Sequence, residues 1–249
     1  MLKSPRQLKR QWSILVISTA AALAGCGESD TVVIVKKSPG ERPDVDRALA
    51  SKGKLALPAD QQFNYVSFTS GQVGISRGES APVGKDGARC SAKATDGGSA
   101  WGEMQLGYCF DNMSGGPLNG SVHLRFDVTS KQSSKGPAED EHGTQATAKS
   151  HLHFLIKDSA GLTIKTDHLG ESALGKGPQA WSNKVDTTFD ARFEPERGYY
   201  LVLAGRTDTQ AVKGAEVEAS IDIEHLSLEI NWRPAEPEAI KTVTSRSSN

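Results

Sequence analysis

The sixteen residues Val217–Trp232, VEASIDIEHLSLEINW, decide the fold class of this chain. Apolar residues occupy every second position up to Ile223, and they do so again from Leu226 onward in the opposite phase. Alternation with a period of two is typical of a strand that turns one face to a core and the other to water. The change of phase at Glu224-His225 predicts a β-bulge, or a corner where the strand changes sheet.

The same alternation recurs in earlier segments of the chain, around residues 122–128, 152–156 and 185–193. Turn-forming residues separate these segments, and Asp158–Gly161 (DSAG) predicts a hairpin while Glu194–Gly198 (EPERG) predicts a second tight connection. The body shows no helical periodicity longer than two turns. Its strands, about eight to ten by this spacing, predict an all-β fold, namely an antiparallel β-sandwich that is jelly-roll-like.

Composition along the chain predicts four parts. Residues 1–25 are a signal peptide, 26–61 a flexible tether, 62–233 the β-sandwich, and 234–249 a polar, disordered tail. Within the tether, Thr31–Lys36 (TVVIVK) is also compatible with a short strand that docks on the body or on a partner. Within the sandwich, Lys131–Lys149 is a long polar loop.

The first 25 residues have the layout of an export signal. Residues 1–11 are basic, and Trp12–Ala24 is a run of 13 residues without charge. That run is shorter than the roughly 20 apolar residues needed to span a bilayer, but it fits the apolar region of a signal peptide. The alternatives are a buried helix or a single membrane anchor.

The end of this run, Leu23-Ala24-Gly25-Cys26, resembles the lipobox of bacterial lipoproteins. The resemblance implies cleavage before Cys26 and attachment of diacylglycerol to its thiol, usually with a further acyl chain such as palmitate on the new amino terminus. Two or three acyl chains give stable anchoring in a membrane. Gly27, which is not Asp, implies sorting to the outer membrane. An ordinary signal peptide with an incidental Cys26 is the alternative.

Charge narrows the range of partners. The formal net charge is −1 for the whole chain, and it falls to −5 without the four cations of residues 1–25. A mildly acidic body has no electrostatic reason to bind nucleic acid. The expected partners are the membrane, through the lipid anchor, and an envelope protein or a glycan.

Export also bears on the other two cysteines. Cys90 and Cys109 are an even pair once Cys26 is assigned to its lipid, and an oxidising compartment favours their oxidation. We therefore expect a Cys90–Cys109 disulfide, with two reduced thiols as the alternative.

We find no catalytic signature and no cofactor motif in the body. It has no G-x-S-x-G, no phosphate-binding loop and no dinucleotide fingerprint. His151 and His153 share one face of a strand, and His123 lies on the polar face of another, so these three are the metal-ligand candidates. Solvent-facing histidines that bind no metal are the alternative, and we predict neither a metal nor enzymatic activity.

Aromatic side chains are the candidate ligand contacts. Trp101 and Trp181 lie in loop-like sequence, GGSAWGE and GPQAWSN, and Tyr108 and Tyr199 are further candidates for stacking on a sugar. The alternative is that each plugs one end of the sandwich core, because large aromatics bury about 150–250 Å².

The end of the body, RGYYLVLAGRT followed by Val217–Ile230, is similar to galactose-binding-like and carbohydrate-binding jelly rolls. That similarity concerns the fold and assigns no activity. Three functions remain: a non-enzymatic binding or assembly role in the envelope, a glycan- or small-ligand-binding module, and a jelly-roll hydrolase or lyase. A concave sheet lined with Trp, Tyr, Arg and Asp would favour glycan binding, and a flat or convex polar face with a protruding 131–149 loop would favour assembly.

Overall fold

The computed structural model describes residues 34–36, 53–174 and 180–235, and all regular elements in these ranges are strands. They are β1 (Ile34–Lys36), β2 (Lys54–Leu57), β3 (Tyr65–Val73), β4 (Ser76–Val83), β5 (Gly87–Thr95), β6 (Ser99–Asn112), β7 (Leu118–Lys135), β8 (Thr147–Asp158), β9 (Thr163–Ala173), β10 (Ala180–Phe193), β11 (Arg197–Gln210) and β12 (Glu216–Pro234). The all-β prediction is confirmed. The signal peptide and Cys26 lie outside the described residues, as does the tail from residue 236.

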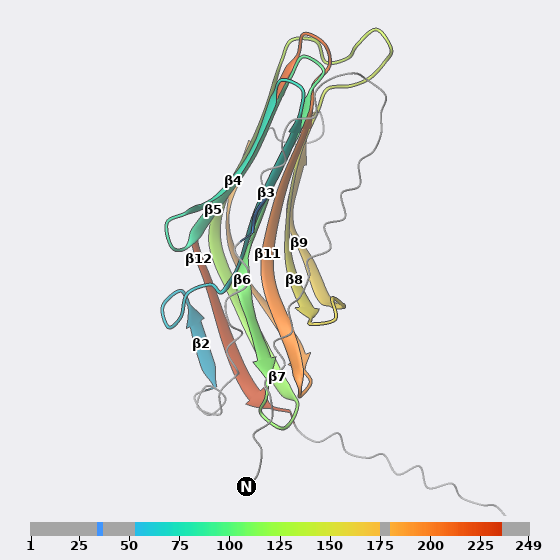
Figure 1. Cartoon of the computed structure of the whole chain (residues 1–249). Helices are drawn as coiled ribbons and strands as arrows, with labels where there is room; N and C mark the ends of the chain where they lie inside the picture. The colour runs from blue at the N-terminus through green and yellow to red at the C-terminus, as the bar shows by residue number, and fades with distance from the viewer. Residues whose placement is uncertain (1–33, 37–52, 175–179, 236–249) are drawn as a thin grey trace, which may run out of the picture.

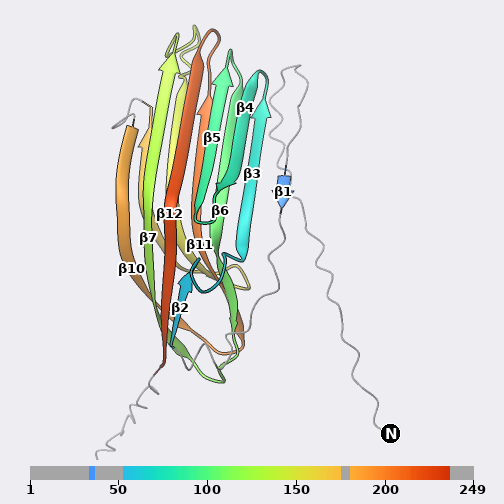
Figure 2. The ribbon, with the colours of Figure 1, turned by 90° about the vertical axis from the view of Figure 1, so that its left-hand side faces the viewer.

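The strands form two antiparallel sheets that pack face to face (Figures 1 and 2). Sheet A has the order β1-β3-β6-β11-β8-β9, and sheet B has the order β10-β7-β12-β5-β4, with β2 added alongside β12. The predicted antiparallel β-sandwich is therefore confirmed. In Figure 1 the long strands bow toward the sheet B side, so the outer face of sheet A lies on the inside of the curve.

The last eight strands are connected as a jelly roll. Strands β5 and β12 are paired, and so are β6 with β11, β7 with β10, and β8 with β9. These four nested pairs alternate between sheet B and sheet A, which is how a long two-stranded ribbon wraps into a sandwich. The consecutive strands β3 and β4 extend the two sheets at one side, where β3 pairs with β6 in sheet A and β4 pairs with β5 in sheet B.

The phase change in β12 is a β-bulge within one sheet. Pairing with β7 continues on both sides, and the register shifts between Glu224 and Ser227. His225 takes a φ of 56° in the bulge, a left-handed conformation that L-residues adopt at an energetic cost. The bulge keeps both apolar runs of the strand on the core side, as the buried Ile223 and Leu226 show.

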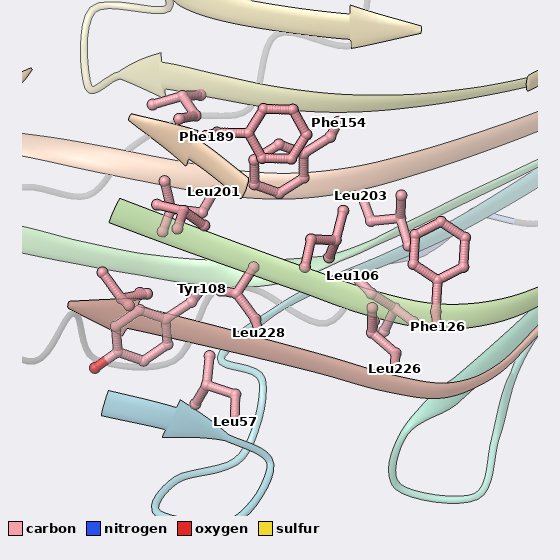
Figure 3. Close-up of a cluster of buried hydrophobic side chains, with 14 of the residues drawn as sticks. Leu57, Leu106, Tyr108, Phe126, Phe154, Phe189, Leu201, Leu203, Leu226 and Leu228 are labelled. Carbon is pink, nitrogen blue, oxygen red and sulfur yellow. The ribbon is translucent and has the colours of Figure 1, made fainter. Parts of the chain in front are cut away.

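The core lies between the sheets and is made of the alternating apolar residues (Figure 3). Aromatic rings fill one end of it: Phe110 lies within 5.2–5.6 Å, centroid to centroid, of Phe193, Tyr199 and Trp232. Near the other end a separate cluster contains only alanines and valines among its buried residues, including Ala94 and Val217. Small side chains let the two sheets approach closely there.

Two strands fall in the segment predicted to be a tether. Strand β1 pairs with β3 through Ile34–Lys36, so the short strand expected within residues 31–36 docks on the body. Strand β2 pairs with β12 and buries Leu55 and Leu57. The sandwich therefore begins before residue 62, because these two leucines complete the core.

The long polar loop is shorter than the sequence predicted. Strand β7 continues to Lys135 and β8 begins at Thr147, which leaves residues 136–146 as the connection. The sequence pattern missed these strand ends because their buried positions carry polar side chains. Ser130, Gln132 and Ser150 are buried and form hydrogen bonds with one another or with Ser172. In the part of the chain that the structure describes, no helix is long and apolar enough to cross a membrane.

Candidate functional site

The outer face of sheet A is the candidate functional site. Strand register places outward side chains from neighbouring strands in cross-strand rows. One row runs through Glu103 on β6, Arg206 on β11, His151 on β8 and Glu171 on β9. The next contains Gln105, Ala204, His153 and His168. We call this surface the polar face.

Trp101 occupies one end of the polar face. Its half-buried indole lies over β3 at Gly71, where a Cβ atom would come within 2.5 Å of Nε1, so the absence of a side chain makes room for the ring. The guanidinium of Arg206 lies 5.3 Å from the ring centroid. Trp101 and Asp208 line a hollow of about 390 Å³ together with Lys149 and His151.

Arg206 is held in place by two carboxylates. Its Nη2 donates to Asp208 Oδ1 at 2.7 Å and its Nε donates to Asp208 Oδ2 at 2.9 Å, while Glu103 Oε2 lies 3.6 Å from Nη1. The hydrogen bonds that Arg206 donates to Asp208 raise the pKa of the guanidinium, so the cation is present at all physiological pH values. The arrangement fixes a planar cation against an aromatic ring.

Two tyrosines occupy the other end. The rings of Tyr65 and Tyr200 meet edge to face with centroids 5.5 Å apart. The Tyr65 hydroxyl donates to Gln105 Oε1 at 2.9 Å, and Gln105 Nε2 donates to Glu103 Oε1 at 2.6 Å. Burial raises the pKa of Tyr65, which keeps its hydroxyl protonated. These rings line a second hollow of about 350 Å³, closed by Lys157 and the β8–β9 turn.

Between the two hollows, three histidines and a glutamate form what we call the histidine cluster. His151 and His153 lie on β8 with ring centroids 6.4 Å apart, and His168 on β9 lies 4.8 Å from His153. Glu171 Oε1 is 3.8 Å from His151 Nδ1, and its Oε2 is 3.6 Å from His168 Nε2. Desolvation lowers the pKa of His153, and the charges of His168 and His151 lower it further.

The three histidines named as metal candidates do not converge. His151 and His153 lie together, but His123 lies on the outer face of sheet B, where its Nε2 is 2.5 Å from Asp186 Oδ1. Within the described ranges, no group of three or more His, Cys, Asp or Glu residues is placed to hold a metal ion. Strand order, which the sequence could not supply, places β7 in the opposite sheet, so the three candidates do not share a face.

Trp181 is partly buried and packs against the main core cluster. Its ring lies beside Gly170 on β9, where a Cβ atom would approach within 2.6 Å. It thereby lies between the β10 edge of sheet B and the β9 edge of sheet A. This packing favours the alternative of a core role for Trp181.

Tyr108 and Tyr199 are also core residues, with 1% and 2% of their surface exposed. The tyrosines on the polar face are Tyr65 and Tyr200, which the sequence did not single out. Tyr199 and Tyr200 are adjacent in β11, so they point to opposite faces of the sheet. The alternation of buried and outward residues along β11 would have identified Tyr200 as the outward-facing tyrosine of the pair.

The predicted disulfide is absent from the structure. Cys90 and Cys109 are both buried and are not bonded to each other. The Cys90 thiol lies beside the hydroxyl of Thr207 on β11. Cys109 is in register with Tyr200 on the same strand. Thr207 and Tyr200 are seven residues apart. Seven residues of strand span about 23 Å, well beyond the ~4.4–6.8 Å between Cα atoms that a disulfide permits. Burial raises the pKa of Cys90 to about 12.

A third hollow lies on the outer face of sheet B. It measures about 650 Å³ and is lined by Asn119, Arg192, Asn231 and Arg233 among others. Its tryptophan, Trp232, is 5% exposed and packs edge to face on Phe110, so it offers no stacking surface. Of the three hollows, the two on the polar face therefore combine aromatic rings with polar side chains.

Comparisons with protein-family models, with curated proteins and with solved structures give no match to this chain.

Proposed function

We propose that this chain is a lipid-anchored protein of the bacterial cell envelope whose β-sandwich binds carbohydrate and catalyses no reaction. The lipobox-like Leu23–Cys26 supports the anchor, and Gly27 supports its location in the outer membrane. The observation that carries carbohydrate binding is the pair of aromatic platforms, Trp101 and Tyr65–Tyr200, at the two ends of one polar face.

Aromatic rings and planar polar groups are the combination that sugars require. The C–H face of a sugar ring packs on a flat apolar surface, while its hydroxyls need donors and acceptors at the edge of that surface. Trp101 has Asp208 and Lys149 beside it, and Tyr65 has Gln105 and Lys157 beside it. Each hollow therefore offers a ring together with both kinds of hydrogen-bonding group.

The distance between the platforms suits an oligosaccharide rather than a single sugar. Tyr65 is in register with Gly107, which lies six residues along β6 from Trp101, a separation of roughly 20 Å. Gln105, Glu103 and Arg206 line the stretch between them. A glycan that reaches both platforms would lie along the strands, on the inside of the bow (Figure 1).

An assembly role is the competing function for the sandwich. Aromatic side chains on the inner curve of a polar face favour glycan binding, whereas a flat or convex face dominated by the 136–146 loop would favour assembly. Nucleic acid could also stack on aromatic rings, but the acidic body opposes it.

The test uses the chain from residue 26 onward, with Cys26→Ser so that no lipid is added. A glycan array identifies ligands, and calorimetry measures their affinity for this protein and for its Trp101→Ala and Tyr200→Ala variants. Each variant should bind at least about threefold more weakly, which corresponds to the loss of one aromatic contact.

Arg125→Ala on the outer face of sheet B is the control, and it should bind like the parent protein. Array-wide absence of binding would overturn the proposal, as would equal losses in all three variants. Release of shortened sugars from a bound ligand would overturn the non-enzymatic part alone.

A further inference from the structure

The histidine cluster lies in the middle of the polar face and has no role in the stacking described above. Its imidazoles come from two neighbouring strands, His151 and His153 from β8 and His168 from β9. The side chains of His151 and His168 are 30% and 46% exposed, so a ligand on the face can reach them.

The surface around the cluster carries no excess of positive charge when the histidines are neutral. Glu171 on β9 contacts two of the rings, Arg206 on β11 is in register with His151, and Lys149 on β8 is in register with Asp208. Glu103 on β6 and Asp208 offset Arg206. Lys157 lies at the far hollow. Asp158 also lines that hollow, so the face carries no excess of cations while the histidines are neutral.

Protonation of the three histidines adds as many as three positive charges within a small area of the face. Glu171 can offset one imidazolium, but a second or third would face other cations at ring distances of 4.8–6.4 Å. Like charges at such separations oppose each other. An anionic group placed among the rings would relieve this repulsion, so its binding and proton uptake must favour each other.

We propose that the histidine cluster is a proton-controlled anion site on the carbohydrate face, and that the face therefore binds acidic glycans more tightly in mildly acidic solution. The chemical class is an oligosaccharide bearing carboxylates or sulfates. This inference rests on the proposed function, because it assumes that a glycan lies on the polar face.

Two properties of the site support this assignment. Imidazole has an unperturbed pKa near 6.5, so its charge changes between pH 5 and 8, where carboxylates and sulfates remain ionised. Desolvation is the main cause of the lowered pKa of His153, and the charges of His168 and His151 lower it further, which is the mutual repulsion that the proposal uses.

The test compares an acidic glycan with its neutral counterpart at pH 5.5 and 7.5, in buffer containing a metal chelator. Oligogalacturonate and its methyl ester are suitable first probes, and any acidic ligand from the array can be compared with its esterified or desulfated form. The acidic form should bind about fivefold or more tightly at the lower pH, a gain equivalent to one or two exposed ion pairs, and the neutral form should not change.

Variants locate the effect. His168→Gln and His151→Gln should each reduce the pH-dependent gain, and Glu171→Gln should raise the affinity for the acidic form at pH 7.5. His123→Gln on the outer face of sheet B is the matched control and should keep the full gain.

The outcomes separate this inference from the proposed function. Neutral and acidic forms that bind equally at both pH values would overturn the inference and leave carbohydrate binding standing. A gain that survives in both cluster variants would also overturn it. No binding of any glycan at either pH would overturn both.

Discussion

The indole of Trp101 lies over the backbone of Gly71, on the neighbouring strand of sheet A. A Cβ atom on Gly71 would fall 2.5 Å from Nε1 and 2.7 Å from Cε2 of the ring. The orientation of the ring on the polar face therefore depends on a missing side chain in β3.

Gly71→Ala should displace the indole and leave the fold intact, because a side chain can swing away where backbone cannot. We expect glycan affinity to fall about three- to tenfold, and the free energy of unfolding to fall by less than about 1 kcal/mol. Tryptophan fluorescence should report a changed environment. Gly116→Ala is the control, since nothing lies within 4 Å of its Cβ position. An unchanged emission spectrum together with unchanged affinity would contradict the prediction.

Cys90 and Cys109 should behave as buried thiols. In the Cys26→Ser protein, a thiol reagent should titrate two thiols in denaturant and react far more slowly with the native protein, because both residues are buried and burial raises the pKa of Cys90 to about 12. The melting temperature should not change when a reductant is added. A count of no thiols in denaturant would show that the pair is oxidised.

Acid should destabilise the sandwich partly through His153. The pKa of this histidine is lowered in the folded protein, so the unfolded chain binds its proton more readily. The free energy of unfolding therefore falls as the pH drops below about 6.5, the pKa of an unperturbed histidine.

His153→Gln should make this acid-induced fall smaller by about 0.2–1 kcal/mol, the range for cross-strand pairs. Urea unfolding at pH 7.5 and 5.0 measures it, with His142→Gln in the 136–146 loop as the control. An equal acid-induced fall in the parent protein and in both variants would show that His153 does not contribute to the loss of stability.

Phe110 should be among the most costly core positions to truncate. Its ring is fully buried and contacts Phe193, Tyr199 and Trp232. Phe110→Ala should lower the free energy of unfolding by about 3–5 kcal/mol, as chemical denaturation would measure. Phe110→Leu should cost less, since it leaves a smaller cavity. A cost below about 1 kcal/mol for the alanine variant would mean that this end of the core is loosely packed.

Lipid attachment should depend on Cys26. Cys26→Ser should abolish labelling of the protein by a palmitate analogue in bacteria and leave the precursor uncleaved, because in the proposed anchor the Cys26 thiol carries the diacylglycerol. Gel mobility and in-gel fluorescence measure both effects. Cys109→Ser should still be labelled, and retention of the label in Cys26→Ser would rule out the proposed anchor.

The alternation of apolar residues made the fold class predictable, including the bulge at Glu224-His225. Period-two patterns are local and survive without knowledge of the partner strand. The strands missed or cut short include β2, the part of β6 around Trp101 and the end of β7. In these segments the pattern covers few residues, or the buried positions are small or polar, such as Ala100 and Gln132. Of the candidate site residues, Trp101, His151 and His153 were found because their types are rare and chemically distinctive.

The sequence by itself determined that the chain folds into an antiparallel sandwich, because the alternation of apolar and polar residues within each strand identifies its buried face. Only the tertiary structure decided which strands are neighbours, and so which residues share a face. It separated Cys90 from Cys109 and His123 from His151, and it joined His168 and Glu171 to the histidines of β8. Strand order depends on contacts between residues far apart in the chain, and no local pattern records them.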